Sequence, residues 1–328
     1  MPAAARLPDL FWSILMSIRR PLLAALALAS VLASTPFALA QDTRTVTTSF
    51  GDVEVPVNPQ RVITTHYIAT QPLLDLGLVP VGQGAITAAN VPDDYWAQIE
   101  NVPVVATPAG EVNLEQAAAL EPDLIFAINT MDPAQVDELR KLAPVVLVGI
   151  SGPDRAKWQS RVAQIAEATN RTAELKTVEE AFAARQADIK ARTGDMAAAH
   201  PIAVWVAWDF GEPALYPSNT MSGRILEPAG AVYAQSVEAL KTEDGSDVYL
   251  SNETLGDALA DAQILFYGTA LNGDPIETTT QTRDLGTYKA LSATAAGYEF
   301  PIGKLTIAGY GDANAILTYY EKALASLH

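Results

Sequence analysis

The order of apolar runs and helical patterns is the feature that most restricts the fold of this 328-residue chain. Five apolar runs of strand length occupy the first half, and helix patterns lie between them. The runs are at 61–65, 78–82, 102–106, 123–129 and 144–150, and the helix patterns are at 68–76, 92–100, 113–120 and 132–142. Because the runs do not alternate apolar with polar residues, they predict a mostly parallel sheet with helices on both faces.

A stretch without any strand pattern then interrupts this order. Between residues 153 and 192 no apolar run of strand length occurs, and the sequence from 170 predicts one helix of about 22 residues, which ends at Gly194. The strand and helix order resumes afterwards, with strand runs at 202–208 and 262–269 and helix patterns at 222–229 and 312–326.

Sheet-building segments on both sides of the long helix predict two α/β lobes. The expected N-terminal lobe is 41–169, the linking helix is 170–194, and the C-terminal lobe is 195–328. The alternative is one large α/β domain in which this helix lies on the surface.

The first 40 residues have the layout of a secretory signal peptide. Arg19 and Arg20 precede a short apolar stretch, and the Ala-Leu-Ala sequence at 38–40 is typical of a cleavage site. A transmembrane anchor is the alternative, but the apolar stretch is interrupted and short for a membrane span. We expect cleavage after Ala40, and translation could start at Met16 rather than at Met1.

Export and composition narrow the location and the partners. The sequence has no Cys to carry a lipid, which argues against a lipoprotein and predicts a periplasmic protein, with secretion to the medium as the alternative. The formal net charge of −17 argues against nucleic acid and anionic membranes as partners.

Motifs for catalysis are missing from the sequence. The only His residues, at 66, 200 and 328, do not have the spacing of a zinc site, and no serine-hydrolase elbow, phosphate loop or dinucleotide fingerprint occurs. We therefore expect a protein that is not an enzyme and has no cofactor. An exported enzyme acting on a small polar substrate is the alternative.

Candidate binding residues lie at the carboxyl ends of the predicted strands, where ligands collect in parallel α/β sheets. They are His66, Tyr67, Gln83, Asn129, Trp208, Tyr216 and Tyr267. Each of them could instead be part of the packing, and Tyr67 is preferred over His66 because a phenol can contact a ligand by its ring and its hydroxyl. Trp205 should face the core, because it points away from Trp208 in an extended strand.

Two arginines are candidates for an anionic ligand. Arg224 begins a predicted helix, and Arg283 lies in a polar loop. Either could donate charge-assisted hydrogen bonds to an anion, or could be a solvated surface residue.

Several segments resemble one family when they are taken in order. They are GDVEVPVNPQRVITT, LLDLGLVPVG, NLEQAAALEPDLIFAIN and APVVLV in the first half, and GRILEPAGA, YLSNETLGDALADAQILFYG and YKALSATAAGYEFPIG in the second. Over residues 45–326 the chain is similar to periplasmic substrate-binding proteins of ABC importers of ferric siderophores, the helix-linked class that includes haem and cobalamin binders.

The resemblance implies two lobes with the ligand in the cleft between them, modest hinge motion, and delivery to an inner-membrane ABC permease. It implies a monomer, and iron that is carried within the chelate rather than bound by the protein. It also implies docking through one surface glutamate on each lobe, at positions matching Glu115 and Glu253. Those two residues stand out independently, because each lies eight residues before an aspartate, Asp123 and Asp261, that leads into an apolar run.

The identity of the ligand stays open in the sequence. Three dispersed His residues argue against a bare-metal receptor. A neutral hydroxamate chelate, a catecholate and a carboxylate all remain, and so does haem, for which His66 or Tyr67 could be an axial ligand, or cobalamin.

Overall fold

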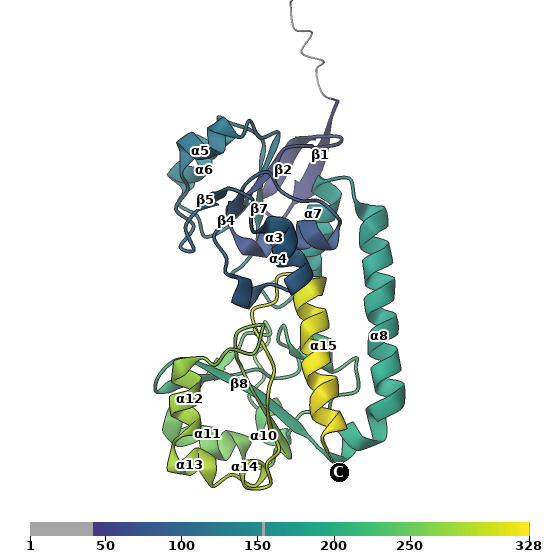
Figure 1. Ribbon diagram of the computed structural model, residues 1–328, viewed down its shortest axis with the longest axis vertical. Coiled ribbons are helices and arrows are strands. Elements are labelled where there is room, and N and C mark those ends of the chain that lie inside the picture. Colours follow the sequence, from purple (N-terminus) through teal and green to yellow (C-terminus); the bar gives the residue numbers. More distant parts are fainter. Residues whose placement is uncertain (1–41, 153–154, 328) are drawn as a thin grey trace, which may run out of the picture. The chain divides into compact units, whose positions relative to one another are not determined.

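The structure is a computed structural model that describes residues 42–152 and 155–327 (Figure 1). From Thr43 onward the chain forms one compact unit. The predicted signal peptide and its cleavage site at Ala40 lie outside the described residues. No helix in the described part combines the length and the apolar character that a membrane span requires.

The N-terminal lobe is built on parallel strands, as predicted. Strands β3, β6 and β7 form one sheet in the order β3-β6-β7, and β4 and β5 form a separate pair. A bridge between Ile63 and Gly82 connects this pair to the sheet. The strands are β3 (Val62–Thr64), β4 (Gln83–Gly84), β5 (Val104–Ala106), β6 (Leu124–Ile128) and β7 (Val145–Val148). The helices are α3 (Tyr67–Asp75), η1 (Ala88–Asn90), α4 (Asp93–Ile99), α5 (Leu114–Ala119), α6 (Pro133–Arg140) and α7 (Trp158–Ala168).

A hairpin and a helix of this lobe were not predicted. An antiparallel hairpin, β1 (Thr43–Thr48) with β2 (Gly51–Pro56), precedes the parallel strands. Helix α7 lies in the stretch without strand patterns and buries Trp158 completely.

The C-terminal lobe contains a five-stranded sheet in the order β10-β9-β8-β11-β12. Strands β8, β11 and β12 are parallel, whereas β9 and β10 add antiparallel pairs at one edge. The strands are β8 (Ile202–Asp209), β9 (Glu212–Leu215), β10 (Val248–Tyr249), β11 (Ile264–Tyr267) and β12 (Glu299–Pro301). The helices are α9 (Gly223–Leu226), α10 (Gln235–Glu238), α11 (Asn252–Leu259), α12 (Glu277–Arg283), α13 (Gly286–Lys289), α14 (Ser292–Ala295) and α15 (Tyr310–Ala325).

The helix between the sheets is longer than predicted. Helix α8 (Thr172–Ala199) has 28 residues, about 42 Å at 1.5 Å per residue, and it passes through Gly194 instead of ending there. Gly194 is not among the residues with positive φ, so it does not form the left-handed cap that the prediction assumed. The helix ends at Ala199, with His200 as its C-cap, and the next residue is Pro201, which cannot continue a helix.

Helix α15 lies beside α8, and charged side chains join the two helices (Figure 1). The Glu321 carboxylate is paired with Arg185, with 2.8 Å between Nη2 and Oε2, and also with Arg192. Helix α15 therefore packs against α8, the long helix that joins the two lobes.

The central strands of both lobes are buried. All five residues of β6 and the first six residues of β8 are buried, which explains why their sequences do not alternate. Trp205 is fully buried whereas Trp208 is 38% exposed, so the prediction that Trp205 faces the core is confirmed.

Candidate functional site

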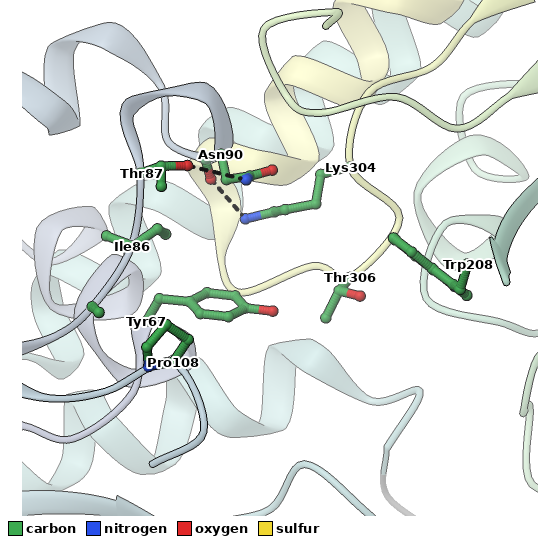
Figure 2. Close-up of a pocket in the computed structure, with 9 residues that line it drawn as sticks. Tyr67, Ile86, Thr87, Asn90, Pro108, Trp208, Lys304 and Thr306 are labelled. Atoms are coloured by element: carbon green, nitrogen blue, oxygen red, sulfur yellow. Dashed lines mark hydrogen bonds between the residues drawn. The ribbon is translucent and has the colours of Figure 1, made fainter. Parts of the chain in front are cut away.

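A cavity of about 320 Å³ lies between residues of the two lobes, and Figure 2 shows its wall. Its lining is mostly apolar or uncharged: Tyr67, Ala85, Ile86, Thr87, Asn90, Pro108, Trp208, Lys304 and Thr306. Each of these residues lies within or soon after the carboxyl end of a strand, namely β3, β4, β5, β8 or β12. This is the edge at which parallel sheets deliver residues to a ligand.

The turn from β3 into α3 places Tyr67 in the cavity. His66 is the extended N-cap of α3, and its Nδ1 accepts a hydrogen bond from the Ile68 backbone N–H at 3.3 Å. A Cβ at Gly84 would lie 2.5 Å from the Thr65 carbonyl oxygen, so only glycine lets β4 approach this turn so closely. The close approach brings the residues after β4 beside Tyr67.

The Tyr67 hydroxyl is available to a ligand. It has no hydrogen bond to any residue in 42–152 or 155–327, and in Figure 2 it points toward the space beside Thr306. Burial raises the pKa of Tyr67 to about 12, and the nearby Asp312 carboxylate adds to this shift. At neutral pH the phenol is therefore protonated and can donate a hydrogen bond.

Trp208 forms the opposite wall, and a buried tyrosine orients it. The indole Nε1–H donates to the Tyr216 hydroxyl at 3.2 Å. Tyr216 is only 5% exposed, and burial keeps its pKa above the ordinary value, so its oxygen remains a neutral acceptor. The exposed indole face is left for stacking on a ligand (Figure 2).

Lys304 lies at the top of the cavity as drawn in Figure 2, and its ammonium group is bonded to the protein. Nζ lies 2.7 Å from Asp312 Oδ2 and donates to the Asn90 carbonyl oxygen at 3.0 Å. The Gln71 amide takes the orientation in which both ends have partners: its oxygen accepts from Nζ at 3.0 Å and its nitrogen donates to Asp312 at 2.6 Å. Nζ is also 5.0 Å from the Tyr67 ring centroid.

A second buried carboxylate fixes the start of α15 to α3. Asp75 accepts hydrogen bonds from the backbone N–H groups of Tyr310 at 2.7 Å and Gly311 at 2.9 Å, and from the Tyr95 hydroxyl at 2.6 Å. Burial raises the pKa of Asp75 to about 7, although these three donors oppose the shift. The helix that carries Tyr67 is thus joined to the helix that follows Lys304 and Thr306.

Three other candidates from the N-terminal lobe lie outside the cavity wall. His66 stacks on Tyr67 with 4.4 Å between ring centroids, and burial, aided by Lys304, lowers its pKa to about 4. Gln83 is buried and donates to the Ile99 carbonyl at 2.8 Å. Asn129 binds the segment after β7, accepting from the Ile150 N–H at 2.9 Å.

The candidates Arg224, Tyr267 and Arg283 are also not in the lining. The Arg224 Nε donates to the Asn219 carbonyl at 3.1 Å. The Arg283 guanidinium lies 3.7 Å from the Tyr267 ring centroid and is paired with Glu299, so these three side chains form a group of their own.

Several lining residues had not been singled out in the sequence: Ala85, Ile86, Thr87, Asn90, Pro108, Lys304 and Thr306. The first three could have been located if the end of the strand had been placed correctly. The prediction ended the strand at residue 82, so that Gln83 followed it. In the structure β4 covers Gln83–Gly84, and the residue that follows it is Ala85. Lys304 carries no such signal, because its partners come from distant elements.

Glu115 and Glu253 occupy equivalent settings in the two lobes. Both are exposed, and each lies in the first turn of a helix whose N-cap side chain, Asn113 or Ser251, accepts a backbone hydrogen bond. The acidic side chains that follow are also equivalent: Asp123 accepts from the Gln60 and Arg61 N–H groups, and Asp261 accepts from the Ser236 N–H. The sequence echo thus corresponds to repeated local structure.

No group of three His, Cys, Asp or Glu side chains in the described part of the chain is placed to hold a metal ion. The cavity itself offers an aromatic and aliphatic surface with a few hydroxyl and amide groups. Such a lining, at the strand ends of two α/β lobes, defines a ligand-binding protein.

The chain belongs to the periplasmic binding protein family, whose sequence pattern matches residues 62–284. It is 29% identical over 236 residues to the probable siderophore-binding lipoprotein YfiY of Bacillus subtilis, and the alignment covers 69% of each chain. It is 25% identical over 259 residues to the ferric enterobactin-binding periplasmic protein FepB of Escherichia coli, over 71% of this chain and 77% of that one.

Among solved structures, the chain is similar to the siderophore periplasmic binding protein from the fuscachelin gene cluster of Thermobifida fusca. The TM-score is 0.67 at 25% identity, and the match covers 83% of this chain and 99% of that one. The family consists of substrate-binding proteins, so the expectation of a binding protein rather than an enzyme is confirmed.

Proposed function

We propose that this protein captures a ferric siderophore in the cavity between its lobes and delivers it to an inner-membrane ABC permease. The observation that carries the proposal is the cavity wall, in which Tyr67 and Trp208 face a common space from different lobes (Figure 2). An aromatic wall with a few hydroxyl donors suits a bulky chelate that has an organic exterior and an iron centre out of reach of the protein. The names of the similar proteins support the same ligand class.

We further propose a periplasmic location and a monomeric receptor. A lipid is attached through a Cys, and the sequence has none. The first 40 residues have the pattern of a cleaved signal peptide. The lobes we propose are 41–169 and 195–328, joined by the linker 170–194, most of which belongs to α8.

Titration of the purified protein with ferric siderophores, haem and cobalamin, followed by intrinsic tryptophan fluorescence, tests the ligand class. We expect a ferric siderophore to quench the emission, because Trp208 lies in the cavity wall. Trp208→Phe should remove most of the quenching while calorimetry still detects binding. A Soret shift on haem addition without siderophore binding would replace the proposal with haem capture, and no binding of any ligand would refute it.

We also propose that Glu115 and Glu253 dock the two lobes onto the permease. Both carboxylates are exposed, and the two lie in equivalent positions, in the first turn of a capped helix of each lobe. Their removal should leave the fold intact, because a first-turn glutamate contributes only about 0.3–1 kcal/mol to its helix.

The double variant Glu115→Ala/Glu253→Ala is expected to lower siderophore import roughly tenfold, as two exposed ion pairs of up to about 1 kcal/mol each allow. Ligand affinity should stay within about twofold, because neither residue lines the cavity. The matched control is Glu174→Ala/Glu277→Ala, which removes two other exposed first-turn glutamates. Unchanged import by the first double variant would rule out this docking role.

A further inference from the structure

The charge of the cavity wall restricts the class of chelate that it can hold. Among the described residues that line the cavity, Lys304 is the only one with a formal charge, and none is a carboxylate. The other polar side-chain groups are the hydroxyls of Tyr67, Thr87 and Thr306, the amide of Asn90, and the indole N–H of Trp208, which is bonded to Tyr216. Any ionic recognition from this wall would therefore have to come from Lys304.

The Lys304 ammonium is not available for that purpose. An ammonium group has three N–H donors, and three protein acceptors lie within 3.0 Å of it: Asp312, the Asn90 carbonyl and the Gln71 amide oxygen. Its side chain is only 7% exposed, and that of Asp312 is fully buried. The charges of the ammonium and the carboxylate cancel, so the ion pair has no net charge.

Apart from Lys304, no ionisable group in the described part of the chain presents a cation at the cavity surface. Burial and the nearby Lys304 lower the pKa of His66 to about 4, so its imidazole is neutral at pH 7. Arg161 has no carboxylate partner, but it is only 4% exposed. Its guanidinium donates to the carbonyls of Arg155 at 2.9 Å and Ile307 at 2.6 Å, and it does not line the cavity, so it does not contact a bound chelate directly. Asp75, another buried ionisable group behind the wall, can carry only a negative charge and is bonded to α15.

We propose that the cavity selects ferric chelates with little or no net charge, of the trihydroxamate kind, over trianionic tricatecholates. Three singly charged hydroxamates balance Fe(III), whereas three doubly charged catecholates leave three negative charges. Bringing such an anion into a wall without an accessible counter-charge would cost several kcal/mol. The Tyr67, Thr87 and Thr306 hydroxyls suffice as donors to hydroxamate oxygens. This inference rests on the proposed siderophore capture.

Competition between two probes tests the selection. Ferrichrome, a neutral ferric trihydroxamate, is expected to bind at least tenfold more tightly than ferric enterobactin, a trianionic tricatecholate. Its affinity should change by less than about twofold between low and high salt, because no net charge is screened. Tighter binding of ferric enterobactin would overturn the inference but leave siderophore capture intact, whereas binding of neither probe, nor of any other ferric siderophore, would refute the capture itself.

A gain-of-function variant separates charge from shape. Thr87 is exposed at the cavity rim, so Thr87→Lys adds a free cation there. We expect it to raise the affinity for ferric enterobactin about tenfold at low salt, with the gain lost at high salt. Thr47→Lys, on the exposed hairpin strand β1, adds the same charge away from the cavity and should have no such effect. An unchanged affinity in Thr87→Lys would overturn the inference.

Discussion

Replacing Trp208 by Ala is expected to weaken siderophore binding roughly 30-fold. The indole forms one wall of the cavity, and its N–H is held by Tyr216 at 3.2 Å, so its exposed face is preorganised for stacking. Loss of a well-placed aromatic anchor costs about 2 kcal/mol or more, and 1.4 kcal/mol corresponds to tenfold in affinity. Isothermal titration calorimetry is the suitable measurement, because the variant lacks Trp208, the tryptophan whose emission is expected to report binding.

Phe210→Ala is the matched control for Trp208→Ala. Phe210 lies two residues further along the same hairpin, is 55% exposed and does not line the cavity. Its removal should leave the affinity within about twofold. Equal losses in the two variants would mean that the hairpin, and not the indole, determines binding, and an unchanged affinity in Trp208→Ala would remove Trp208 from the site.

Replacing Lys304 by Met is expected to destabilise the protein by about 3–5 kcal/mol, because it leaves the Asp312 carboxylate buried without its counter-ion. Burial already raises the pKa of Asp312, and Lys304 opposes that shift, so the lysine stabilises the ionised form of the buried carboxylate. Thermal unfolding should show a melting temperature lowered by about 10 °C or more.

The double variant Lys304→Met/Asp312→Asn should recover most of this loss. It removes both charges and leaves an amide oxygen that can still accept from the Ala308 N–H. The control is Lys289→Met, which breaks the exposed pair with Asp284 and should cost less than about 1 kcal/mol. A double variant as unstable as Lys304→Met would show that the two charges are not coupled.

The general fold could be predicted from the sequence because it depends on local patterns. Apolar runs such as 123–129 and 202–208 became the buried strands β6 and β8, and the helix patterns between the early runs became α3 to α6. The end of α8 was wrong, because Gly194 is tolerated inside a helix at a cost of only about 1 kcal/mol. Antiparallel pairing such as β9 with β10 was missed, because short edge strands carry little sequence signal.

The site could be predicted only in part, for a different physical reason. Tyr67 and Trp208 were located from the rule that strand ends face ligands, and both line the cavity. From the sequence, Arg283 could not be distinguished from a ligand-binding residue, because its ion-pair partner Glu299 comes from another element. Lys304 depends on Gln71 and Asp312 in the same way, and contacts between distant segments cannot be read from local sequence.

The contact between Asp75 and the start of α15 has a consequence for folding during synthesis of the chain. Asp75 belongs to the first helix of the N-terminal lobe, whereas Tyr310 and Gly311, which donate to it, belong to the last helix of the chain. A Cβ at Gly309 would lie 2.0 Å from Asp75 Oδ2, so the two segments meet without space for any other residue. During synthesis, the lobe that emerges first can therefore offer this carboxylate the Tyr95 hydroxyl, but the two backbone donors arrive only when nearly the whole polypeptide has been made.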